Sequence, residues 1–108
     1  MALVVSSETA QAELERILTY SLQKFGKLAA RRIDAEQLRV KHRLSVFPKS
    51  GFPETLLEGR THEYRSCTIR KRFKMVYYYD EPTDTVHVMD FWDMRMSPIR
   101  LTKRIKKE

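Results

Sequence analysis

Only one cysteine, Cys67, occurs among the 108 residues, so no disulfide can form within the chain. No apolar run approaches the roughly 20 residues that a membrane-spanning helix needs, and residues 1–6 lack the basic region and long apolar core of a signal peptide. The sequence contains neither a Gly-rich phosphate loop nor a metal-ligand spacing. From these absences we expect a cytoplasmic protein without a membrane partner, a cofactor or a metal site.

What the chain does have is positive charge. Its net charge is +7 and its pI is about 9.8, because 21 lysines and arginines outnumber 14 acidic residues. Such a balance favours an acidic partner, which is either a nucleic acid or an acidic protein segment. The length suits one domain with a modest core, so we expect a single domain over residues 1–108.

The N-terminal half predicts one strand and two helices. Residues 2–5 form a short apolar run that suits a strand, and Ser6 or Ser7 is placed to cap the helix that follows. Gly26 should end that helix, and a second helix should continue to the loop around Pro48. The apolar positions of the first helix are Ala10, Leu14, Ile17, Leu18 and Phe25. Those of the second are Ala30, Ile33, Val40, Leu44 and Phe47, with Gln37 in the remaining place and Arg31, Arg32, Lys41 and Arg43 on the other face.

Three runs rich in aromatic and β-branched residues follow, at 63–69, 73–79 and 86–92. Such runs predict antiparallel strands, and the charged or turn-forming residues at 70–72 and 80–84 separate them. Each helix has one apolar stripe that must be covered, so both should pack on one face of the sheet. The predicted fold is a two-layer α+β domain with an N-terminal strand, a helical hairpin and a three-stranded antiparallel meander.

Two basic tracts are candidates for contact with an acidic partner. Arg70-Lys71-Arg72 forms either a soluble hairpin tip that blocks edge aggregation or a contact to phosphate or to an acidic protein. The C-terminal tail is either a short amphipathic helix or a frayed basic end, and both forms suit an acidic partner. Its basic residues are Arg100, Lys103, Arg104, Lys106 and Lys107.

Residues capable of acid–base or nucleophilic chemistry are scattered. We expect His42 to be a solvated helix residue, His62 to lie in the polar approach to a strand, and His87 to be packed in the sheet. Cys67 has no activating partner nearby in the sequence and is expected to be a small strand residue. These residues do not by themselves assemble into an established catalytic motif.

Five short motifs occur along nearly the whole chain: Phe25-Gly26 with Ala30, Phe47-Pro48-x-x-Gly51, Tyr64-Arg65, Val76-Tyr77 and Arg95-x-x-Pro98. In their order and spacing they resemble the RelE/ParE superfamily of bacterial type II toxins. The resemblance implies a toxin of a plasmid stabilisation-type toxin–antitoxin system, held inactive by an acidic antitoxin whose C-terminal segment wraps around it. The residues expected to bind partners are Arg31, Arg32, Arg70, Lys71, Arg72, Arg100 and Arg104.

The superfamily has two branches with different modes of action. RelE-like members cut mRNA inside the ribosome with basic residues on the open face of the sheet, which stabilise phosphate charge while protons are transferred. The resemblance places Arg65 and Lys74 on that face, together with Asp93, so that Arg65 and Asp93 could form an ion pair. The catalytic candidates are therefore Arg65, Lys74, Asp93 and Arg95.

Three positions depart from the ribonuclease pattern. Cys67 stands where a lysine is expected, Asp93 where an arginine or histidine is expected, and Ile99 near the place of a terminal tyrosine. The chain therefore resembles more closely the ParE-like branch, which is associated with binding and poisoning DNA gyrase and not with chemistry of its own. A ribosome-dependent endoribonuclease and a non-toxic binding relative are the alternatives.

Overall fold

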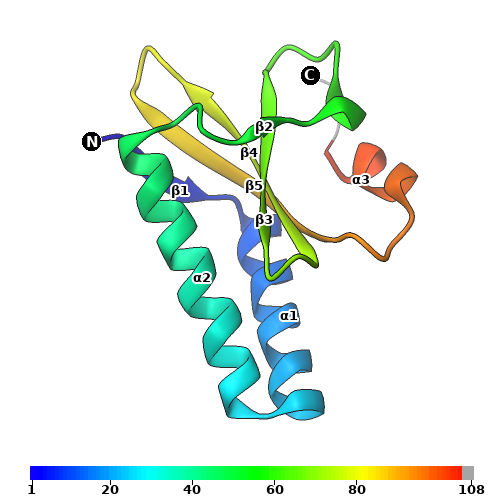
Figure 1. Ribbon diagram of the computed structural model, residues 1–108. Helices are drawn as coiled ribbons and strands as arrows, with labels where there is room; N and C mark the ends of the chain where they lie inside the picture. The colour runs from blue at the N-terminus through cyan, green and yellow to red at the C-terminus, as the bar shows by residue number, and fades with distance from the viewer. Residues whose placement is uncertain (106–108) are drawn as a thin grey trace.

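The computed structural model describes residues 1–105 and arranges them as helices packed on a five-stranded mixed sheet of order β1-β5-β4-β3-β2 (Figure 1). β1 pairs with β5 in parallel, and the other neighbours are antiparallel. The predicted strand, helical hairpin and three-stranded meander are confirmed. In chain order the elements are β1 Leu3–Ser6, α1 Glu8–Phe25, α2 Lys27–Val46, β2 Phe52–Pro53, the 3₁₀ turn η1 Thr55–Leu57, β3 Tyr64–Ile69, β4 Phe73–Asp80, β5 Thr85–Asp93 and α3 Pro98–Arg104.

The helical hairpin is joined by a single residue. Ser7 caps α1 by accepting a hydrogen bond from the amide of Ala10 at 3.1 Å, and Gly26, with φ 91°, both ends α1 and precedes α2. A side chain is strained at such a φ, which explains the glycine. Figure 1 shows the closed end of the hairpin projecting beyond the sheet. Within the described residues, neither these helices nor α3 is long and apolar enough to cross a membrane.

The tip of the β3–β4 hairpin has an unusual backbone. Arg70 and Lys71 both have positive φ, at 54° and 56°, and the amide of Arg72 donates to the carbonyl of Ile69 at 3.1 Å. Two successive residues of positive φ are typical of a type I′ turn, which normally uses Asn and Gly. Because a side chain in this region costs about 1–2 kcal/mol, the basic tip is less stable than a tip built of the usual turn residues.

Two clusters of buried side chains lie on opposite faces of the sheet. The larger lies under α1 and α2 and includes Ala10, Ile17, Val40, Leu44, Ile69, Phe73, Met75, Val86 and Phe91. The smaller lies on the other face and consists of Leu57, Tyr64, Val76, Trp92, Leu101 and Ile105. η1 and α3 contribute Leu57 and Leu101 to this second cluster, so the second face of the sheet is also covered, which the sequence did not predict. The tail therefore forms the amphipathic helix and not the frayed end, while Lys106 and Lys107 lie outside the described residues.

Three predicted side-chain environments on the hairpin are wrong. Phe25 and Phe47, expected on the apolar stripes, are 56% and 63% exposed. Both end their helices, Phe25 where the hairpin projects past the sheet and Phe47 at the C-cap of α2. Lys41, expected on the solvated face, is half-buried, with its Nζ 5.6 Å from the centre of the Phe91 ring. Burial lowers the pKa of Lys41 below its ordinary 10.5.

Candidate functional site

The two basic residues that the ribonuclease pattern requires on one face lie on opposite faces of the sheet. Alternate residues of a strand share a face. Arg65 is two residues from Cys67, which belongs to the cluster under the helices, whereas Lys74 is two residues from Val76, which belongs to the cluster on the other face. The expectation of a shared open face is therefore wrong, and these two cations cannot bind the same phosphate.

Each of these cations instead holds a local piece of structure. Arg65 donates to the backbone carbonyl of Gly51 at 2.9 Å and to Glu63 at 2.6 Å, which fixes the loop after α2. Lys74 donates to Glu54 at 2.7 Å. The side chain of Glu54 is only 2% exposed, so Lys74 neutralises an otherwise buried carboxylate. Both contacts are sufficient to explain these residues without a ligand.

The expected ion pair between Arg65 and Asp93 does not form. Arg65 lies opposite Tyr77 of β4, whereas Asp93 lies opposite Phe73 of the same strand. Four residues along a strand correspond to about 13 Å, and β4 also separates β3 from β5. The two side chains therefore occupy different ends of the sheet.

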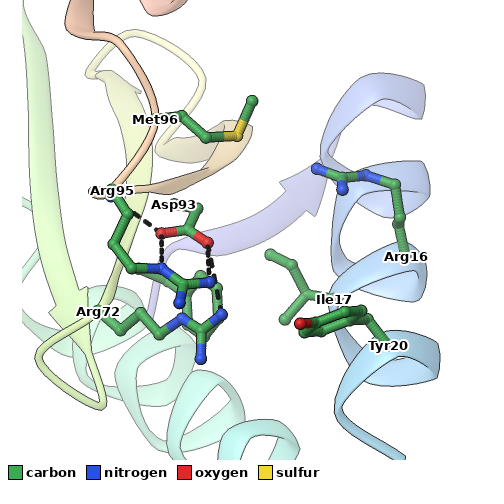
Figure 2. A pocket seen from close by; sticks show the side chains of 8 residues that line it. Arg16, Ile17, Tyr20, Arg72, Asp93, Arg95 and Met96 are labelled. Carbon is green, nitrogen blue, oxygen red and sulfur yellow. Dashed lines mark hydrogen bonds and ion pairs between the residues drawn. The ribbon is translucent and has the colours of Figure 1, made fainter. Parts of the chain in front are cut away.

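Asp93 lies in a small cavity between α1 and the end of the sheet, which we call the arginine pocket (Figure 2). Its carboxylate is 2.9 Å from the Nη2 of Arg95 and 3.6 Å from that of Arg72. The opposite wall is α1, which contributes Arg16 and Tyr20. Three arginines and one carboxylate line the pocket, so its lining carries net positive charge, and Arg16 is itself paired with Glu13 at 2.5 Å. The cavity measures about 130 Å³ and is lined by Arg16, Ile17, Tyr20, Arg72, Phe73, Asp93, Arg95 and Met96.

The residues expected to bind partners fall into two groups. Five of them are exposed, on α2, at the hairpin tip and on α3: Arg31, Arg32, Arg70, Lys71 and Arg100. The other two are engaged within the fold. Arg72 binds Asp93, and Arg104 binds Asp90 and Glu13 at 2.5 and 3.4 Å. Arg104 thus holds α3 on the sheet, with its guanidinium 5.0 Å from the centre of the Trp92 ring.

Asp90 is a charged residue that the sequence analysis missed. Its side chain is fully buried in β5, and its Oδ2 has no hydrogen-bond partner among the described residues. Burial raises the pKa of Asp90 to about 6, against the opposing attraction of Arg104. The sequence did contain a sign of this role: Asp90 is a single carboxylate between Met89 and Phe91 in an apolar strand. A carboxylate buried in such a strand requires a cation from elsewhere in the chain.

Comparison with known proteins identifies the family of this chain. The family described as the ParE toxin of type II toxin-antitoxin systems, parDE, matches residues 4–98. The chain belongs to this ParE toxin family. No curated protein matches it.

Two solved structures share the fold of this ParE family member at low sequence identity. One is a chain titled "Chromosomal ParDE TA system from P. aeruginosa", with TM-score 0.67 and 13% identity over 86% of this chain and 96% of that one. The other is titled "Crystal structure of metal-bound toxin from Helicobacter pylori", with TM-score 0.63 and 16% identity over 88% of this chain and 97% of that one. At such identities the likeness establishes the fold alone.

Three further residues of this ParE family member that could carry chemistry, His62, His87 and Cys67, are packed against other side chains or buried. His62 and His87 stack on Tyr78, with ring centroids 3.8 and 4.8 Å away, so the prediction of a packed His87 is confirmed. Cys67 is buried, and burial raises the pKa of its thiol, which disfavours the nucleophilic thiolate. Across residues 1–105 there is no cluster of three His, Cys, Asp or Glu side chains that could hold a metal ion.

Proposed function

We propose that this ParE family member is the toxin of a type II toxin–antitoxin pair and inhibits growth by binding a cellular protein, with DNA gyrase as the candidate target. The observation that carries the proposal is the dispersal of Arg65, Lys74 and Asp93 over two faces and two ends of the sheet. RNA cleavage requires proton transfer and stabilisation of phosphate charge at one place. A surface that binds protein has no such requirement.

The partner that would silence this toxin is an acidic antitoxin. A net charge of +7 and the exposed cations of α2, the hairpin tip and α3 favour an acidic segment lying over them. We place the pair in the cytoplasm, as part of a plasmid stabilisation-type system, with residues 1–108 acting as one toxin domain.

One observation favours the ribonuclease as a second candidate. In the arginine pocket, Asp93 is paired with Arg72 and Arg95, and Arg16 lines the opposite wall. Cations that bind a phosphate, next to a carboxylate that accepts a proton, are the elements of acid–base cleavage. The carboxylate would also repel the phosphate, so we rank this candidate below the protein-binding toxin. A non-toxic binding relative is the third possibility.

Induced expression in bacteria separates the three. Growth, the supercoiling of a reporter plasmid and the integrity of mRNA are followed in the same cultures. We expect growth arrest with altered plasmid supercoiling and uncut mRNA. Codon-specific mRNA cuts that appear within minutes and vanish in Arg95→Ala would identify the ribonuclease. Normal growth at full expression of the folded protein would identify the non-toxic relative.

A further inference from the structure

The arginine pocket adjoins a second cavity of similar character. The two share Arg72 and Phe73, at the point where the β3–β4 tip meets the helical hairpin. The second cavity measures about 280 Å³ and adds Arg32 and Arg70 to the basic side chains. Its lining residues are Ser21, Phe25, Ala29, Arg32, Ile33, Arg70, Arg72 and Phe73. Arginines and apolar side chains thus line both cavities.

Arg72, which belongs to both cavities, is incompletely satisfied. Its Nη2 is 3.6 Å from Asp93, a distance too long for a good hydrogen bond. Its Nε is buried and has no acceptor within residues 1–105. A buried donor without an acceptor is unfavourable, so Arg72 has hydrogen-bonding capacity that its contact with Asp93 does not use.

The size and walls of the arginine pocket select among anions. About 130 Å³ is roughly the volume of four water molecules, which accommodates the end of a side chain but is well below the roughly 300–1,000 Å³ of sites for larger ligands. Ile17, Phe73 and Met96 provide apolar wall. A carboxylate on a methylene stem matches both the apolar wall and the arginines, whereas a nucleotide with its sugar would not fit in the arginine pocket alone.

The surrounding surface favours a protein over a nucleic acid. Tyr20 and Phe25 on α1 are 45% and 56% exposed, and Leu28 on α2 is 60% exposed. Tyr20 and Phe25 also line the two cavities. Exposed aromatic side chains beside arginines are the composition of protein interfaces. A phosphate backbone would instead contact cations and polar groups.

We propose that the arginine pocket binds a carboxylate side chain of an acidic protein segment, whose apolar side chains cover Tyr20 and Phe25. The carboxylate oxygens accept hydrogen bonds from Arg16 and Arg72, while Asp93 keeps Arg95 in place. This inference rests on the antitoxin part of the proposed function and adds the point of attachment. It is independent of whether the target of the toxin is gyrase.

The test measures binding of a short synthetic peptide of repeating Glu and Leu to the full chain at physiological salt. Isothermal calorimetry gives the affinity, and NMR follows the Nε–H signals of the arginines. We expect the peptide to shift the signals of Arg16 and Arg72. Arg16→Gln and Arg72→Gln should each weaken binding about tenfold, the loss expected for one charge-assisted contact. Lys49→Gln removes the same charge from an exposed site in the loop after α2, outside the set of residues expected to bind partners, and should leave the affinity unchanged.

Other results would overturn the proposal. An equal loss in Lys49→Gln would mean that only the overall charge attracts the peptide. A single-stranded oligonucleotide or inorganic phosphate that binds with the same dependence on Arg16, while the peptide does not, would assign the pocket to phosphate. If Arg72→Gln fails to fold, Arg16→Gln decides, because the side chain of Arg16 is 59% exposed and pairs with Glu13 on its own helix. Growth arrest is scored separately, so peptide binding by a non-toxic chain would reject the proposed function alone.

Discussion

Removing the guanidinium of Arg104 would leave Asp90 as an unpaired carboxylate in the interior. Asp90 is fully buried and Arg104 is its cationic partner at 2.5 Å, with Glu13 completing the group at 3.4 Å from Arg104. Breaking a buried pair by deleting one partner typically costs about 3–5 kcal/mol. The side chain of Arg104 is 24% exposed, so solvent weakens the pair and the lower end of this range applies. We therefore expect Arg104→Met to lower the free energy of unfolding by about 3 kcal/mol near pH 8.

The cost of losing Arg104 should depend on pH, because Asp90 is titratable. The pKa of Asp90 is raised from 3.8 to about 6, so the folded protein takes up a proton more readily than the unfolded chain. The stability that this proton confers is fully present below pH 3.8 and is lost as the pH rises through about 6. Two pKa units correspond to about 3 kcal/mol. Loss of Arg104 raises the pKa of Asp90 further, so the deficit of Arg104→Met should shrink at about pH 5.

Urea unfolding of the wild type, Arg104→Met and the double variant Asp90→Leu/Arg104→Met measures these free energies. The double variant replaces the pair with apolar side chains and should recover most of the loss. A cost below about 1 kcal/mol for Arg104→Met near pH 8 would mean that the pair behaves like an exposed one. A double variant as unstable as the single one would show that the loss comes from packing and not from the unpaired charge.

Three further substitutions test other parts of the fold. Lys71→Gly should raise the free energy of unfolding by about 1 kcal/mol by relieving a positive φ; calorimetry would detect the gain, which Lys71→Ala should lack. Gly51→Ala should lower it by about 1–3 kcal/mol, because a Cβ would lie 2.6 Å from the Oη of Tyr77; an unchanged melting temperature would refute this contact. Lys74→Met should lower the free energy of unfolding by about 2 kcal/mol, because it leaves the buried carboxylate of Glu54 without its cation. The double variant Lys74→Met/Glu54→Gln should recover part of this loss in urea titrations.

The helical hairpin and the meander could be predicted because their signals are local. Apolar spacing marked α1 and α2, Gly26 marked their junction, and aromatic runs marked β3, β4 and β5. β2 and η1 contain two and three residues, too few to show a period. The parallel pairing of β1 with β5 joins distant segments and leaves no local trace.

The arrangement of the site was harder to predict, since its residues come from separate segments. Arg16 lies on α1, Arg72 at the hairpin tip and Asp93 at the end of β5. One error was avoidable. A three-residue tip at 70–72 places Ile69 opposite Phe73, and the same register places Arg65 opposite Tyr77. Lys74 then lies on the other face, so the register alone contradicts a shared site that the resemblance suggested.

We propose that this ParE family member acts by binding a protein and not by cutting RNA. Adding the purified chain to DNA gyrase and relaxed plasmid, with a parallel reaction on translating ribosomes, tests it most directly. We expect that supercoiling is inhibited in proportion to the toxin added, and that the ribosome-bound mRNA stays intact. Unimpaired supercoiling together with codon-specific mRNA cleavage, lost in Asp93→Asn, would contradict it.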